Sequence, residues 1–394
     1  MSMDSRQPHD AAKPLSEAQF LAEAPLLLNL QKRAETATSL KEWAIARIQA
    51  AIYMARTSRI DEAMGVVSEI KWRFRGNEDA EVFFWIWMLQ GIASFYQTGT
   101  TAGMPLLKRA WTVSRSFDFP ELQEYVAAWA AHFCFTDGKH DDLGLWLRVS
   151  RLDHFKVPEA SCRRALVVAG AFQICNDNTL ARRWYTFARE IARSIGDRAS
   201  IMASIENRAL LRMERLWVEG VRHPPSFELI RDVENELITG LTYERVSCSE
   251  SLVNQGPVAR LRMLVLRQDY LSALAAIDKL GFNLGDSEFS MVRATSILRT
   301  WLMCQLELIE SIEATQIQEM AASVENLDSD DGLVCWGFLA DLASRYFGAA
   351  LADVFRVRAK ECAMKYEEGL SSLASELAMN PNIMDVPTFS RPQV

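Results

Sequence analysis

The chain has 394 residues, of which 49% are hydrophobic and 24% are charged, and this composition excludes an intrinsically disordered protein. Its 51 acidic and 43 basic side chains give a net charge of −8. Residues 301–394 carry 15 acidic and 6 basic side chains. This acidic excess disfavours binding along the phosphate backbone of a nucleic acid, so we expect no nucleic-acid partner.

The longest apolar run, residues 82–89, is far shorter than the roughly 20 residues that a membrane-spanning helix needs, so we expect no membrane insertion. Residues 1–15 are polar and lack the apolar centre of a secretory signal peptide. The seven cysteines show no C-x-x-C spacing, and most stand in apolar helical patterns, as is typical of buried thiols in a reducing compartment. We therefore expect a cytoplasmic protein.

From Ser16 onward, apolar residues recur at i, i+3, i+4 and i+7, in segments separated by short breaks that contain Gly, Pro, Asp or Asn. This period is helical, and we find no alternation typical of strands, so we predict an all-α fold. Short connections between helices predict antiparallel neighbours. The predicted order is a disordered tail over 1–15, helical repeats over 16–222, divergent helical repeats over 226–380, and a second disordered tail over 381–394.

Four successive segments repeat one pattern of small and apolar residues. Each set begins with a small residue on the first helix of a pair. Small or apolar residues then stand on the second helix, 12, 16 and 19 positions after that first residue. The four sets are Ala51, Ala63, Val67 and Ile70; Gly91, Gly103, Leu107 and Ala110; Ala131, Leu143, Leu147 and Ser150; and Ala169, Ala181, Tyr185 and Ala188. Turn-forming residues stand seven positions after the first member in three sets, at Ser58, Gly138 and Asn176, and the remaining set has Thr98 followed by Gly99.

This pattern resembles the tetratricopeptide repeat, in which small residues let two antiparallel helices approach closely. Residues 162–196 fit best, with Phe172 where the family favours an aromatic side chain. The sets start 38 to 40 residues apart, against about 34 in the family, and none has its intact Trp–Leu–Gly signature. The resemblance covers residues 43–197 and implies an α-solenoid of antiparallel helix pairs in a right-handed superhelix. Another α-solenoid or a helical bundle is the alternative.

Beyond Asp197 the repeat pattern is weaker. Residues 198–220 predict a long helix that His223-Pro224-Pro225 ends, and this break is the best candidate for a subdomain boundary. Further helices are predicted over 227–241, 258–280 (a pair with Asp269 at its turn), 288–310, 314–326, 332–346 and 350–379, the last being long enough to cap the array.

The sequence contains no phosphate-binding, zinc-binding, nucleophile-elbow or kinase motif. His140 stands beside Asp141 and Asp142, but adjacent residues do not converge easily on one ion, and acidic residues are favoured at the start of a helix. Paired carboxylates such as Asp330 and Asp331 point in different directions from one helix. We therefore expect no catalytic residues, no cofactor and no metal, and a protein that is not an enzyme.

Arginine is frequent between residues 157 and 278, where lysine is absent. Three arginines on one predicted helix are spaced i, i+4 and i+7 and share one face. Arginine binds carboxylates in a bidentate way that lysine cannot. Because first helices line the concave groove of a right-handed superhelix, we predict a groove for an acidic peptide, as an alternative to ordinary exposed charge. The candidate partner-binding residues are Arg163, Arg164, Arg182, Arg183, Arg208, Arg212 and Arg215.

The resulting functional hypothesis is a protein–protein interaction scaffold or adaptor that binds a peptide or partner protein in a helical-repeat groove. The alternative is a ligand-responsive helical-repeat regulator that binds a peptide or a small metabolite. The segment before Trp43 is too short for a complete DNA-binding domain of the kind that such regulators often carry, which disfavours this alternative. RNA binding and an unrecognised enzyme are the other hypotheses, and the acidic charge balance disfavours the first of these.

Overall fold

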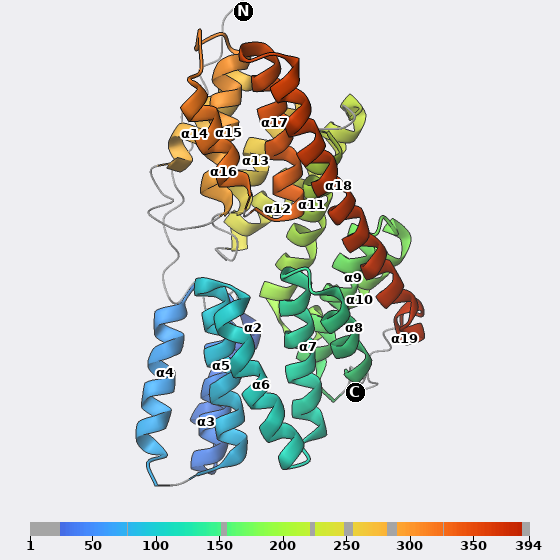
Figure 1. Cartoon of the computed structure of the whole chain (residues 1–394). Helices are drawn as coiled ribbons and strands as arrows, with labels where there is room; N and C mark the ends of the chain where they lie inside the picture. Colours follow the sequence, from blue (N-terminus) through green and yellow to red (C-terminus); the bar gives the residue numbers. More distant parts are fainter. Residues whose placement is uncertain are drawn as a thin grey trace, which may run out of the picture. The chain divides into compact units, whose positions relative to one another are not determined.

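The computed structural model describes residues 24–76, 78–150, 156–220, 225–247, 255–281, 290–325 and 327–387. Throughout these ranges the regular secondary structure is α-helical and no strand occurs (Figure 1). The prediction of an all-α fold is therefore confirmed for the described part of the chain. The tail predicted over 1–15 lies outside the described residues.

The helices follow one another along the described parts of the chain. They are α2 (Pro25–Glu35), α3 (Leu40–Ala55), α4 (Ile60–Arg73), α5 (Ala80–Thr98), α6 (Thr100–Ser116), α7 (Pro120–Thr136), α8 (His140–Val149), α9 (Pro158–Ile174), α10 (Asn178–Ile195), α11 (Arg198–Gly220), α12 (Phe227–Ser247), α13 (Gln255–Leu266), α14 (Tyr270–Gly281), α15 (Ser290–Gln305), α16 (Ala314–Val324), α17 (Ser329–Tyr346), α18 (Ala349–Ala378) and α19 (Pro381–Met384). The predicted helix over 198–220 is confirmed at both ends, and the long helix predicted over 350–379 corresponds to α18.

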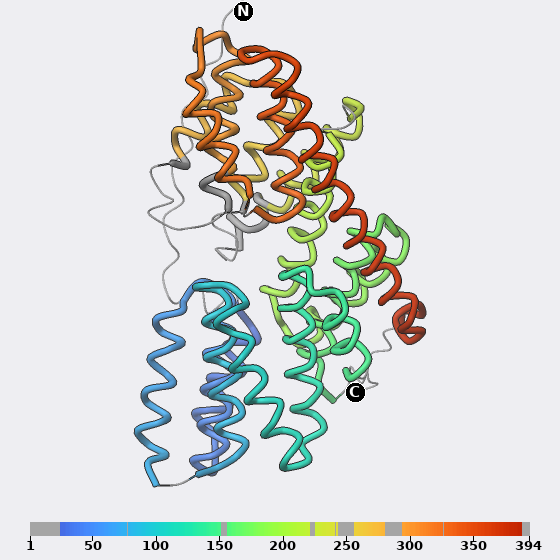
Figure 2. Tube along the Cα trace, viewed as in Figure 1, coloured from blue at the N-terminus to red at the C-terminus, as the bar shows by residue number. Residues whose placement is uncertain are grey.

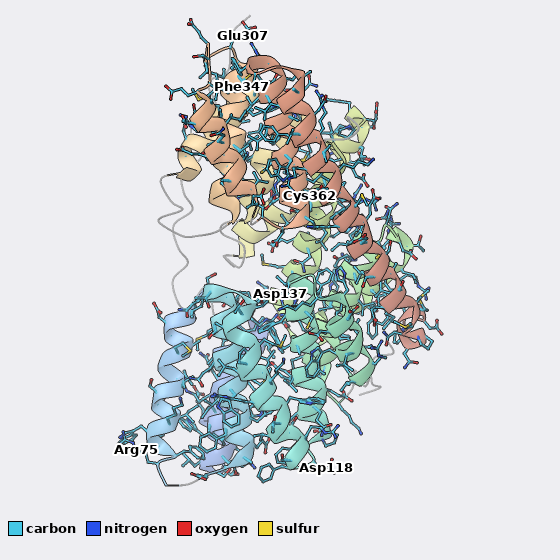
Figure 3. All side chains as sticks on the ribbon, viewed as in Figure 1. Arg75, Asp118, Asp137, Glu307, Phe347 and Cys362 are labelled. Carbon is cyan, nitrogen blue, oxygen red and sulfur yellow. The ribbon has the colours of Figure 1, made fainter. Side chains whose placement is uncertain are left out.

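From α3 to α18 the helices fall into consecutive pairs, and helices pack against their neighbours along the chain. We call α3, α5, α7, α9, α11, α13, α15 and α17 the first helices of these pairs. Seven of the connections within pairs, all in the described part of the chain, contain one residue with positive φ. These residues are Ser58, Gly99, Gly138, Asn176, Gln268, Glu307 and Gly348, and Glu307 is labelled in Figure 3. Within each half of the chain they recur at intervals of 38 to 41 residues.

Five of these turns share one hydrogen bond. The residue after the positive-φ position donates its N–H to the carbonyl five residues earlier, as from Lys139 to Cys134 and from Asp269 to Leu264, both 2.9 Å. This bond closes a Schellman-type helix end, which needs a left-handed residue. The turns predicted at Ser58, Gly138 and Asn176 are confirmed, and the same geometry returns at Gln268, where the sequence pattern is weak.

Contacts divide the structure into two compact units, and neither is one continuous segment. The first comprises Met1–Phe117, Ala192–Met202 and Leu241–Ser251, and the second comprises Asp118–Ile191, Ala203–Gly240 and Leu252–Val394. The boundary predicted at residues 223–225 falls largely on residues 221–224, which lie outside the described residues.

The first unit is held together by a buried ion pair between distant segments. Arg56 at the end of α3 donates from Nη1 to Asp197 Oδ2 at 3.0 Å and from Nη2 to Oδ1 at 3.2 Å. Arg56 Nη2 also donates to Ser200 Oγ at 2.8 Å. Asp197 caps α11 by accepting from the Ser200 amide at 3.0 Å, so one carboxylate both starts that helix and fixes α3.

In the second unit, the 30-residue helix α18 packs first on α17 and then on α8 and α9 (Figure 2). Glu376 on α18 accepts from Arg148 on α8 at 2.8 Å. Residues 381–387 of the segment predicted as a tail are described. They include α19, whose Ile383 is fully buried and accepts at its carbonyl from Trp184 Nε1 at 2.9 Å. This part of the segment is packed.

Candidate functional site

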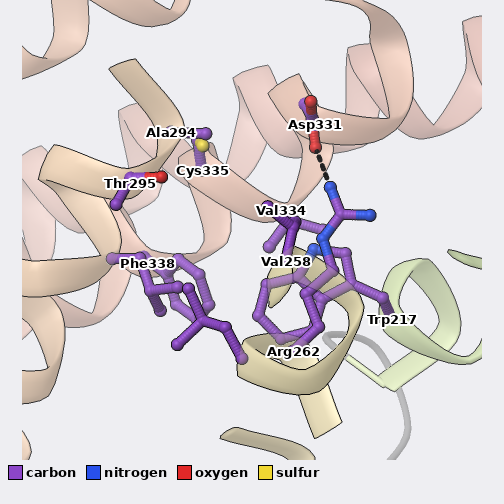
Figure 4. Close-up of a pocket in the computed structure, with 11 residues that line it drawn as sticks. Trp217, Val258, Arg262, Ala294, Thr295, Asp331, Val334, Cys335 and Phe338 are labelled. Carbon is purple, nitrogen blue, oxygen red and sulfur yellow. Dashed lines mark hydrogen bonds and ion pairs between the residues drawn. The ribbon is translucent and has the colours of Figure 1, made fainter. Parts of the chain in front are cut away.

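The first helices of the last four pairs meet around one cleft in the second unit (Figure 4). Its cavity volume is about 30 Å³, room for about two water molecules, and the rest of the roughly 390 Å³ around it is open to solvent, so the cleft is a shallow depression. The lining residues are Trp217 from α11; Val258, Leu261 and Arg262 from α13; Ala294, Thr295 and Leu298 from α15; and Asp331, Val334, Cys335 and Phe338 from α17. Apolar side chains make up most of the wall, and four polar groups interrupt it.

A series of contacting aromatic rings begins at this wall and continues into the protein. The ring of Phe338 lies 5.8 Å from that of Trp217 and 4.6 Å from that of Trp301, measured between centroids. Trp301 in turn meets Tyr270 edge-on at 5.4 Å, and its Nε1 donates to Asp341 Oδ2 at 3.3 Å. Because aromatic rings have few rotatable bonds and bury a large area, they hold α11, α14, α15 and α17 in a fixed arrangement around the cleft.

Arg262 joins three of the four first helices. Its Nη1 donates to Glu214 Oε1 on α11 at 2.6 Å, and its Nη2 donates to Asp331 Oδ1 on α17 at 2.9 Å. The guanidinium carbon lies 5.7 Å from the centre of the Trp217 ring, and only 13% of the side chain is exposed. A guanidinium suits this position because its planar fork can serve two carboxylates and an aromatic face at once.

Two aspartates near Arg262 have raised pKa values. Burial, with a smaller contribution from the neighbouring carboxylates Asp330, Glu214 and Asp328, outweighs the opposing charge of Arg262 and raises the pKa of Asp331 to about 6. Burial, with the charge of Asp330, also raises the pKa of Asp328. The cleft therefore has a carboxyl group that can change its charge within the physiological range.

Two of the seven arginines predicted to bind a partner are buried in α9. Arg163 is 5% exposed and its guanidinium lies 4.2 Å from the centre of the Trp129 ring. Arg164 is 2% exposed; its Nη2 donates to the Leu147 carbonyl at 3.3 Å, whereas Nε and Nη1 have no hydrogen-bond partner. These two side chains belong to the packed interior, so their predicted role in a partner-binding groove does not agree with the structure.

The other five arginines do not form one open groove either. Arg208 and Arg212 both pair with Glu236 of α12, at 2.8 and 2.7 Å, and Arg215 pairs with Glu219 of its own helix at 2.6 Å. Arg182 and Arg183 are exposed on α10. Helix α11 does contribute to the cleft, but through Trp217, and its Glu214 pairs with the lining residue Arg262.

No protein-family model, curated protein or solved structure matches the chain. The cleft is therefore interpreted from its own residues. Within the described ranges, no group of three or more His, Cys, Asp and Glu side chains could hold a metal ion. A search of the same residues for a helix with the length and apolarity to cross a membrane finds none. His140, the histidine considered as a ligand, lies against Gly369 of α18, and burial lowers its pKa.

Sequence reasoning missed Arg262, although a signal for it exists. Val258, Leu261 and Val265 mark the apolar stripe of α13 at i, i+3 and i+7, and Arg262 occupies the i+4 position of that stripe. A charged residue at a core-facing position must find partners within the protein. The two partners come from α11 and α17, and their proximity depends on tertiary packing that no local pattern reveals.

Proposed function

We propose that this chain is an interaction protein built from tetratricopeptide-like helix pairs, and that it binds a peptide or a segment of a partner protein in the cleft between α11, α13, α15 and α17. The observation that carries the proposal is the origin of the lining, because four successive first helices each contribute to one cleft. Stacked helical repeats characteristically bind partners on the surface that equivalent helices of successive repeats form together.

The chemistry of the wall supports recognition of a protein segment. Tryptophan and arginine are the side chains most enriched at the energetic centres of protein interfaces, and Trp217 and Arg262 lie together here. The mainly apolar lining with a few fixed polar groups suits a ligand held by burial and oriented by hydrogen bonds. The described cysteines are free and most are buried, which supports the placement of the protein in the reducing cytoplasm.

One observation favours a second candidate, a ligand-responsive regulator that binds a peptide or a small metabolite. Arg262 connects α11, α13 and α17 through two ion pairs. A ligand that competes with Arg262 for Asp331 or Glu214 would alter the packing among three helix pairs. It would then bind one arrangement of these helices better than another, and this difference is what lets a ligand shift a conformational equilibrium.

The test uses a displayed library of random dodecapeptides selected on the immobilised full-length chain. Ala294→Trp fills the cleft, since Ala294 is half-buried in its wall, and Ala374→Trp adds the same bulk at an exposed position of α18. We expect peptides enriched on the wild type to be retained by Ala374→Trp and lost by Ala294→Trp. Equal retention by both variants, or no enrichment, would overturn the proposal.

A further inference from the structure

The cleft lining holds one cation, Arg262, and one anion, Asp331, and further carboxyl groups lie around this pair. Glu214 and Asp331 flank Arg262 directly, and Asp330 and Asp328 lie close enough to raise the pKa of Asp331. Among the described residues neither Asp328 nor Asp330 forms an ion pair, so the carboxyl groups near Arg262 outnumber its single charge; Arg215, which pairs with Glu219, is a second cation in the neighbourhood. An occupant with positive charge would relieve this imbalance, and one with negative charge would increase it.

The aromatic wall beside these acids favours the same kind of occupant. The Trp217 face already attracts the Arg262 guanidinium, and the Phe338 ring lines the cleft next to it. A ring face attracts a cation within about 6 Å of its centre. The apolar wall formed by Leu298, Val334 and Phe338 can bury an alkyl chain.

The free acceptor at the cleft is one oxygen of Asp331. Arg262 donates to Oδ1, and the line between these two groups is visible in Figure 4. Oδ2 can therefore accept from an incoming donor. Such a charge-assisted bond, made at a site where only a small part of the surroundings is water, is stronger than the same bond at an exposed surface.

We propose that the cleft recognises a lysine or arginine side chain of a partner protein, with the alkyl stem against Leu298 and Phe338 and the charged head at Asp331. This inference rests on the proposed function and specifies its ligand. It reverses the charge of the partner that the arginine-rich sequence indicated. Five of those seven arginines are buried or paired and none lines the cleft, whereas Asp331 lines it and other carboxyl groups lie nearby.

The test uses small probes that reproduce the side chains alone. Butylammonium and butylguanidinium chloride present the cation, and sodium pentanoate presents an anion on a chain of similar length. The full chain is labelled with 5-fluorotryptophan, and the Trp217 resonance is assigned from the Trp217→Phe spectrum. We expect both cations to shift this resonance saturably and pentanoate to leave it unchanged. Asp331→Asn should weaken cation binding about tenfold or more, whereas Asp353→Asn, at an exposed position of α18, should not.

A second pair of variants keeps the test independent of Asp331. Thr295 lines the cleft and is half-buried, so Thr295→Lys places a tethered ammonium there and Thr295→Glu places a carboxylate of comparable reach. We expect the lysine variant to have the higher melting temperature of the two and to block the probes. A more stable glutamate variant, or a Trp217 shift caused by pentanoate and not by the cations, would overturn the inference.

The two proposals fail in different ways. Library peptides that are lost by Ala294→Trp but lack basic residues would leave the proposed function standing and refute the basic side chain as ligand. Peptides or probes that bind equally to wild type and Ala294→Trp would refute both.

Discussion

At the scale of single residues, the first unit depends on the buried pair of Arg56 and Asp197, which are respectively 7% and 1% exposed. Removing one member leaves the other charge buried and uncompensated. We predict that Arg56→Met or Asp197→Asn lowers the free energy of unfolding by about 3–5 kcal/mol. Urea denaturation at neutral pH measures this change in the free energy of unfolding. Arg59→Met, which breaks the exposed pair with Glu62, is the matched control and should cost less than about 1 kcal/mol.

The same pair also predicts a pH dependence. Burial alone would raise the pKa of Asp197, but the charge of Arg56 and the hydrogen bonds from Arg56 and Ser200 outweigh it and lower the pKa below its usual value. A lowered pKa contributes stability that is present above the unfolded-state pKa and is lost as the pH falls through the folded-state pKa. The double variant Arg56→Met with Asp197→Leu should lack this part of the acid sensitivity. An unchanged acid profile would contradict the assignment.

Arg164 presents the opposite case, a buried guanidinium with few partners. Burial lowers its pKa to about 10, and Glu124 opposes this effect only in part. We predict that Arg164→Met leaves the unfolding free energy unchanged or raises it by about 1 kcal/mol, because an apolar side chain of similar volume needs no charged partner. Arg163→Met should be destabilising, since that guanidinium lies over Trp129. Thermal unfolding compares the melting temperatures of the two variants. A larger loss of stability in Arg164→Met than in Arg163→Met would contradict this prediction.

At the scale of elements, the turns within pairs are the clearest repeated feature. Gln268 and Glu307 adopt positive φ, of 60° and 57°, where an L-residue with a side chain is strained. We predict that Gln268→Gly and Glu307→Gly each raise the unfolding free energy by about 0.5 kcal/mol, and that Gly138→Ala lowers it by a similar amount. Chemical denaturation checks the signs. A loss of stability in both glycine variants would contradict the shared turn geometry.

The short helix α19 gives a second prediction at this scale. Ile383 is fully buried against the second unit, whereas its neighbour Met384 is 47% exposed. Ile383→Ala should cost about 2–4 kcal/mol through lost burial and the cavity left behind. Met384→Ala should change stability by less than about 0.5 kcal/mol. Equal small effects of the two substitutions would mean that α19 does not pack as described.

The turns within pairs and helix α9 show which features local sequence patterns can predict and which they cannot. Ser58, Gly138 and Asn176 are turn formers, so local chemistry reveals the turns that contain them. At Gln268 the local signal is the following Asp269, and Glu307 takes up the same geometry with no turn-forming residue at its position. Arg163 and Arg164 were expected on a surface, but α9 is buried on all sides, and its charged residues are buried with its apolar ones.

At the scale of the whole molecule, the turn geometry recurs in both halves of the chain, while the candidate site belongs to the last four pairs alone. Fold class follows from periodicity and was predictable. The cleft was not, because its charged residues lie far apart in the sequence and each has an ordinary local interpretation. Asp330 and Asp331 are acidic residues at a helix start, and only the approach of α13 and α11 makes Asp331 part of a buried charge network.

The central claim is that the cleft binds a basic side chain through Asp331, and the pH dependence of binding tests it most directly. The titratable or charged groups near Asp331 are Arg262, Glu214, Asp330, Asp328 and the Cys335 thiol, followed by Cys362 and Tyr366 of α18 and Arg215 of α11. Because the pKa of Asp331 is raised to about 6, the carboxyl is largely neutral below that pH and ionised above it. A cationic ligand favours the ionised form, so its affinity should rise with pH.

The measurement is the dissociation constant of butylguanidinium for the full chain, followed through the Trp217 resonance from about pH 5 to about pH 7.5, a range that spans the Asp331 pKa. We expect tighter binding as the pH rises through about 6 in the wild type, and an affinity independent of pH in Asp331→Asn. Affinity that stays constant or falls with rising pH in the wild type would contradict it.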